Sequence, residues 1–249
     1  MHAIPTDHLI PFDLFENEPI KIDLVYANAK HPHNIFETAL YHSEARMWAH
    51  KDLAAITLLT ARLLNKQYGW VLELKDCLRT IEAQAIMGQT DIVKANPQWM
   101  EEPRMVSPPG EGAHPRAMAI DVCVLDRDNR PVDMGTNFDE MVPAAARGYE
   151  DLPNQVKQNR AILDHAFKVA ADAFAIPILP IPPEWWDFRF VPTQYSTFEP
   201  LRDSDLPPQM QMAKKVDSGM KDFDDAHFQK LGKEISDLLD KHDGNLRAA

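Results

Sequence analysis

Two short segments of the sequence place histidine and carboxylate side chains where they could bind a metal ion. In the first, His114 is followed seven residues later by Asp121. Pro115 and the β-branched residues after it argue against a helix, so we expect His114 on a loop entering a strand and Asp121 within that strand. A histidine and a carboxylate presented together suit a divalent cation. A solvated loop histidine and a locally paired aspartate would give the same spacing.

The second segment places carboxylates on both sides of two consecutive tryptophans. Glu184 precedes Trp185 and Trp186, and Asp187 follows them. A carboxyl group beside large aromatic rings is poorly solvated, which raises its pKa toward the range useful to a general base. Glu184 and Asp187 can converge on one site only if the chain turns near the tryptophans. The alternative is that both tryptophans lie in the core and both acids on the surface.

The secondary structure that must position these segments follows from the apolar periodicity. Helical and alternating patterns are separated by proline-rich loops, and they do not form a regular βαβ alternation, so the fold class expected is α+β. The pattern predicts helices over residues 43–66, 79–94 and 154–173, and strands over residues 70–75, 119–125 and 188–191.

The composition changes near residue 199, where a polar and proline-rich stretch begins. An amphipathic helix is predicted over residues 222–241. We therefore expect residues 1–198 to form one domain and residues 199–249 to form a linker and a helical appendage. This helix could pack back onto the domain, or it could form the contact of a homodimer.

The overall charge excludes several classes of partner. The chain carries 26 basic and 38 acidic residues, a net charge of −12, which argues against nucleic acid and anionic membranes as partners. Cys77 and Cys123 are far apart and fit no paired-cysteine metal or redox motif. We expect no signal peptide and no membrane span, and we predict a cytoplasmic protein with reduced thiols.

The two segments together resemble the D-alanyl-D-alanine dipeptidases, a family of zinc enzymes. That family carries the signatures Ser-x-His-x-x-Gly-x-Ala-x-Asp and, further on, Glu-x-x-His, often as Glu-Trp-Trp-His. The order and spacing of five short motifs agree from about residue 20 to residue 192. The matching residues are His114, Ala119 and Asp121 in the first signature, Glu184, Trp185 and Trp186 in the second, and the similar segments 23–27, 76–79 and 133–139.

The resemblance implies a fold and a metal site. The fold is the α+β metallopeptidase fold shared with D,D-carboxypeptidases, a small antiparallel sheet flanked by helices. His114, Asp121 and Asp187 would be the ligands of one divalent ion, with zinc preferred and manganese or another harder ion second.

The resemblance also assigns roles to four other residues. Glu184 would be the general base that activates water, and Arg79 would stabilise the oxyanion. Asp139 and Tyr26 would hold the free amino group of a small dipeptide substrate. The function implied is metal-dependent hydrolysis of a D-amino-acid dipeptide such as D-alanyl-D-alanine.

Several positions depart from the family pattern. Asp187 stands where the family has its third histidine ligand, and Gly112 replaces the serine two residues before His114. Ala117, Thr80 and Leu78 are further departures. With Asp187, two carboxylates and one neutral histidine would cancel the charge of a divalent ion and weaken it as a Lewis acid.

Two other functions are compatible with the sequence. The domain could be catalytically silent and bind a dipeptide or peptidoglycan fragment, which Asp187 favours, whereas Glu184 and Arg79 favour an enzyme. The protein could also act as a structural partner through its appended helix. In that case deletion of residues 200–249 would abolish function, and mutation of Glu184 would not.

Overall fold

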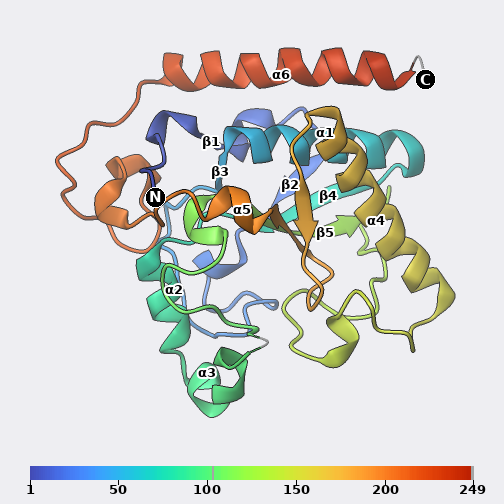
Figure 1. The fold of residues 1–249 in the computed structure, drawn as a ribbon, viewed down its shortest axis with the longest axis horizontal. Helices are drawn as coiled ribbons and strands as arrows, with labels where there is room; N and C mark the ends of the chain where they lie inside the picture. The colour runs from blue at the N-terminus through green and yellow to red at the C-terminus, as the bar shows by residue number, and fades with distance from the viewer. Residues whose placement is uncertain (103, 248–249) are drawn as a thin grey trace.

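The computed structural model describes residues 1–102 and 104–247. Its centre is a five-stranded sheet in the order β2-β4-β5-β7-β6, and β1 and β3 form a separate two-stranded sheet (Figure 1). The strands are β1 (Leu9–Pro11), β2 (Ile20–Ile22), β3 (Trp48–His50), β4 (Val71–Asp76), β5 (Ala119–Leu125), β6 (Ile178–Pro180) and β7 (Asp187–Phe190). The helices are α1 (Lys51–Tyr68), α2 (Ile81–Gly88), α3 (Asp91–Ala95), α4 (Asn154–Ala173), α5 (Pro192–Tyr195) and α6 (Asp225–Arg247).

The central sheet is mixed, which corrects the expectation of an antiparallel sheet. The pairs β4–β5, β5–β7 and β6–β7 are antiparallel, but β2 joins the edge parallel to β4. A parallel neighbour needs a long connection, and the segment between β2 and β4 supplies it with β3 and α1. The α+β class is otherwise as predicted.

The register of the sheet brings three aspartates side by side. Asp76 on β4 pairs with Asp121 on β5, and Asp121 pairs with Asp187 on β7. A register shift between Leu74 and Asp76 places Asp76 opposite Asp121. Bulges of this kind redirect a side chain at the end of a strand. Like charges directly opposite one another destabilise a sheet, so this row of carboxylates requires cations beside it.

One face of the sheet is covered by helices and the other carries the aspartates. Helix α4 packs on the covered face through Phe167, whose ring stacks on Phe188 of β7 at 3.8 Å between centroids. Helix α1 packs against both α4 and β4. Because side chains alternate along a strand, Phe188 on the covered face leaves its neighbour Asp187 on the opposite one.

The C-terminal helix α6 packs back onto α1 and runs along one edge of the molecule (Figure 1). Phe228 and Leu239 on its inner side are buried, and the ring of Phe228 contacts that of Trp48 at 5.5 Å. Arg62 of α1 donates a hydrogen bond to Asp240 at 2.8 Å. The packing of this helix within one chain accounts for its apolar stripe, and the homodimer contact stays a prediction. None of the described helices is both long enough and apolar enough to cross a membrane.

Removing one buried side chain from α6 should measure how much the helix stabilises the domain. Leu239 is fully buried, so we expect Leu239→Ala to lower the free energy of unfolding by about 2–3 kcal/mol. Leu238, its neighbour on the same helix, is 43% exposed, and Leu238→Ala should change stability by less than about 0.5 kcal/mol. Urea titration of both variants provides the comparison, and equal effects would contradict the packing of α6 onto α1.

Candidate active site

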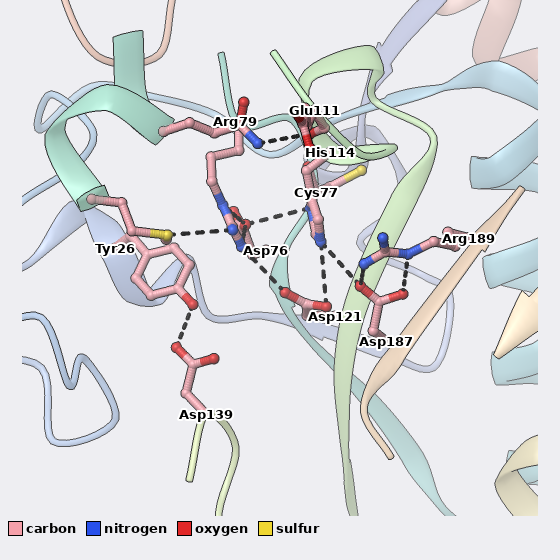
Figure 2. A network of polar contacts seen from close by, with 12 residues as sticks. Tyr26, Asp76, Cys77, Arg79, Glu111, His114, Asp121, Asp139, Asp187 and Arg189 are labelled. Atoms are coloured by element: carbon pink, nitrogen blue, oxygen red, sulfur yellow. Dashed lines mark hydrogen bonds and ion pairs between the residues drawn. The ribbon is translucent and has the colours of Figure 1, made fainter. Parts of the chain in front are cut away.

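His114 begins a short 3-10 helix (His114–Arg116) just before β5, and its ring faces the aspartate row (Figure 2). Nδ1 lies 2.8 Å from the backbone carbonyl of Cys77, which can only accept a hydrogen bond, so Nδ1 carries a proton. Nε2 therefore faces the carboxylates, 3.5 Å from Asp121 Oδ1 and 3.3 Å from Asp187 Oδ2. The structure thus brings together the three residues predicted as metal ligands.

The two separations from His114 Nε2 match those between ligands of a tetrahedral ion, and the ligand atoms that all lie within 4.8 Å of one another belong to Asp76, His114 and Asp121. Zinc bonds to nitrogen and oxygen of about 2.0–2.1 Å give ligand–ligand separations of about 3.4 Å, close to both distances. Asp121 Oδ1 is buried and accepts no hydrogen bond within the described chain. A buried carboxylate oxygen without a partner is costly, and a cation in this position would satisfy it. The donor set of one imidazole and two carboxylates fits a divalent metal.

A fourth residue, Arg189, changes the chemistry of this group. Its Nε donates to Asp187 Oδ1 at 2.7 Å, and its Nη2 donates to Asp187 Oδ2. Arg189 is not among the site residues predicted from the sequence. It could have been found, because residues two apart on a strand point to the same face. The guanidinium offsets the extra negative charge that aspartate has relative to the expected histidine.

The buried charges determine the protonation of the group without a metal. Burial alone would lower the pKa of His114, but Asp121 and Asp187 outweigh it and raise this pKa to about 10. Burial opposes ionisation of Asp187, yet Arg189 and His114 hold its pKa well below the ordinary value. Burial raises the pKa of Asp121. The imidazolium and guanidinium therefore neutralise two carboxylates, and a metal would replace the proton on Nε2.

Arg79 is held beside the row by a residue that the sequence argument missed. Asp76 accepts hydrogen bonds from Arg79 Nε at 2.9 Å and Nη2 at 2.6 Å, and it also accepts one from Tyr41 Oη at 2.5 Å. Arg79 Nη2 lies 3.5 Å from Asp121 Oδ2, and the guanidinium lies over the ring of Tyr26. The i, i+3 spacing of Asp76 and Arg79 in the sequence could have predicted that these two side chains pair.

Glu184 lines the same pocket as His114, Asp121 and Asp187. It lies between two short turns just before β7, and Trp185 and Trp186 of the second turn are buried, so the chain bends as convergence requires. Burial, reinforced by the nearby Asp187 and Asp121 carboxylates, raises the pKa of Glu184 to about 8. Trp185 and Trp186 are core residues, as one of the two arrangements considered from the sequence required. Glu184 and Asp187, however, line the pocket and do not lie on the outer surface.

Asp139 and Tyr26 form a second polar pair in the pocket. Tyr26 Oη donates a short hydrogen bond to Asp139 Oδ2 (Figure 2). Burial raises the pKa of Asp139 to about 7, although the hydrogen bond from Tyr26 opposes the shift. A buried carboxylate with so unfavourable an environment is ready to accept a cationic group from a ligand.

The raised pKa of Asp139 predicts a pH dependence of stability. The folded chain holds this proton up to about pH 7, whereas an unfolded aspartate loses it near pH 3.8, so stability should fall as pH rises between these values. We expect Asp139 to contribute a loss of about 2 kcal/mol between pH 4.5 and 6.5 in metal-free protein. Asp139→Asn should flatten the profile by that amount. Unfolding measured in chelator at several pH values checks this, and parallel profiles would refute it.

A second group of potential ligands, Asp23, His31 and His33, lies away from this pocket. Lys75 already supplies its cation, since Nζ lies 2.6 Å from Asp23 Oδ2 and 3.5 Å from His33 Nδ1. The backbone N–H of His33 donates to His31 Nδ1, so the proton of neutral His31 is on Nε2, 3.0 Å from Asp23 Oδ1. This arrangement is complete without a metal.

Comparisons with known proteins place the chain in a family. A family model described as D-ala-D-ala dipeptidase matches residues 14–199. The D-alanyl-D-alanine dipeptidase of Escherichia coli (strain K12) is 31% identical over 171 residues, which cover 68% of this chain and 78% of that protein. These matches define a hydrolase of the metallopeptidase class. The chain belongs to the D-alanyl-D-alanine dipeptidase family.

Proposed function

We propose that the chain hydrolyses a D-amino-acid dipeptide such as D-alanyl-D-alanine, using one divalent ion held by His114, Asp121 and Asp187. The observation that carries this proposal is the spacing of 3.3–3.5 Å between His114 Nε2 and the facing carboxylate oxygens, one of which has no other partner. A bound zinc ion would polarise the scissile carbonyl. It would also lower the pKa of water, so that the water loses a proton readily as it attacks the carbonyl. Zinc is the preferred ion, and manganese is the second candidate because two of the three donors are oxygen.

The remaining residues supply acid–base and electrostatic chemistry. Glu184 takes a proton from the attacking water and delivers it to the leaving amine, since its raised pKa lies near neutrality. Arg79 donates to the carbonyl oxygen as negative charge develops there, and Asp76 fixes its position. Asp139, positioned by Tyr26, pairs with the free ammonium of the dipeptide.

The size of the pocket favours a small substrate. The cavity lined by these residues has a volume of about 60 Å³, room for about two water molecules. Its walls must move outward to admit even a two-residue peptide. A longer peptide would require a still larger opening, so the small pocket favours the smallest peptides as substrates.

The test is an assay for release of D-alanine from D-alanyl-D-alanine, together with the metal content of the purified protein. We expect release by protein loaded with zinc or manganese, and none after the metal is removed with a chelator. Protein that binds the dipeptide but releases no D-alanine with either ion would overturn the enzyme and support the alternative, a catalytically silent binding domain.

A further inference from the structure

Arg189 uses only two of its N–H donors on Asp187. A guanidinium carries five N–H donors, and one edge of Arg189, formed by Nε and Nη2, binds both oxygens of Asp187. Nη1 makes no hydrogen bond to any residue that the structure describes, and together with the outer N–H of Nη2 it forms a second fork. Such a fork fits a carboxylate with two parallel hydrogen bonds.

The space in front of this second fork is left open by Gly112. The φ angle of Gly112 is 80°, a conformation that disfavours any other residue. A Cβ atom at this position would lie 3.7 Å from Arg189 Nη1 and 3.7 Å from Ser107 Oγ. Both polar groups therefore border the same empty spot. The Ser107 hydroxyl, like Arg189 Nη1, has no hydrogen-bond partner among the described residues, and all three residues line the pocket.

The pocket has opposite charges at its two ends. Asp139 lies on one side of Asp121, and Arg189 lies on the other side (Figure 2). A free dipeptide is a zwitterion with an ammonium group at one end and a carboxylate at the other. Its ammonium suits the end with Asp139, so its carboxylate is left facing the end with Arg189.

We propose that Arg189 and Ser107 bind the free α-carboxylate of the second residue of the substrate, in the space over Gly112. This inference rests on the proposed dipeptide hydrolysis and names the group that the pocket selects. Arg189 is then shared between two carboxylates, one from Asp187 and one from the ligand. The substrate class is a dipeptide with an unblocked C-terminus. In a longer peptide the second residue ends in an amide bond, so no carboxylate lies at the position that Arg189 and Ser107 recognise.

The test compares D-alanyl-D-alanine with its C-terminal amide, which has the same shape and no carboxylate charge. Both are titrated by calorimetry into full-length Glu184→Gln protein loaded with zinc, so that neither is consumed. A charge-assisted pair contributes enough for us to expect the acid to bind about 10- to 100-fold more tightly than the amide. Arg189→Lys, which keeps a positive charge beside Asp187 but lacks the second fork, should reduce this preference to less than about 3-fold. Ser107→Ala, which leaves the ion pair intact, should reduce it in part.

The outcomes separate this inference from the proposed function. Equal binding of acid and amide would overturn the carboxylate site, as would an Arg189→Lys effect of equal size on both ligands. Failure of both ligands to bind would also overturn it. If unmutated protein hydrolyses acid and amide with the same kcat/KM, the carboxylate site is wrong and the dipeptidase stands. If it hydrolyses neither but binds the acid preferentially, the site stands and the dipeptidase is wrong.

Discussion

Glu184→Gln should lower kcat for D-alanyl-D-alanine by about 10²–10⁴-fold, because the amide keeps the shape of the side chain but cannot accept a proton. Glu184 lies outside the predicted ligand set, so the zinc content of the variant should match that of the unmutated protein. Its dissociation constant for the dipeptide should change far less than kcat. Steady-state kinetics with metal analysis of the same samples provides both readouts.

The control for this variant is Glu111→Gln. Glu111 also lines the pocket, but its side chain is 54% exposed and pairs with Arg104, so this change should alter kcat by less than about 3-fold. A Glu184→Gln enzyme that turns over as fast as the control would remove Glu184 from the mechanism. Loss of zinc from Glu184→Gln would instead make Glu184 part of the metal site.

Asp187→His should destabilise the protein by about 3–5 kcal/mol and weaken zinc binding, although it restores the residue that the family pattern leads one to expect. The three ligands considered alone suggest tighter zinc binding by the variant, since exchanging a carboxylate for imidazole leaves more positive charge on the ion. The structure adds Arg189, which is mostly buried and has both of its bonds to Asp187. Removing Asp187 leaves that guanidinium unpaired beside a cation, which is strongly unfavourable.

The double variant Asp187→His/Arg189→Ser tests this explanation. It removes both members of the ion pair and gives a site with the same net charge as the unmutated one, so it should recover stability and bind zinc more tightly than Asp187→His. Thermal unfolding in chelator and competition titration with a zinc indicator measure the two effects. If the single and double variants bind zinc equally, Arg189 does not balance the charge of Asp187.

Local sequence patterns predicted the elements that depend on local forces. The helix over residues 154–173 and the strand over residues 119–125 were predicted with the bounds that the structure shows. The helix predicted over residues 43–66 starts later, at Lys51, because Trp48–His50 pairs with a strand about 40 residues earlier. The helix predicted over residues 79–94 is divided into α2 and α3. Strand β2 has only three residues, too few for a local pattern to predict it, and it pairs with β4.

In the candidate site too, some residues could be predicted from local sequence and others depend on the pairing of distant strands. Spacing and resemblance predicted His114, Asp121 and Asp187 as metal ligands, and the structure places His114 Nε2 beside both carboxylates. The role of Asp76 was not predicted, since its pairing with Asp121 depends on a bulge and on the register of distant strands. Arg189 pairs with Asp187 and offsets its charge, and a count of ligands alone cannot reveal that.

The aspartate row also determines how the site can be lost on heating. Asp76, Asp121 and Asp187 are joined through the backbone hydrogen bonds of three adjacent strands in the interior of the sheet. Local opening of loops and chain ends costs little free energy, whereas separating central strands requires the cooperative unfolding of the whole domain. The amide protons of these strands should therefore be among the last to exchange with deuterium. The geometry of the proposed metal site would then persist up to the melting temperature, so that the domain would keep any activity of this site for as long as it keeps its fold.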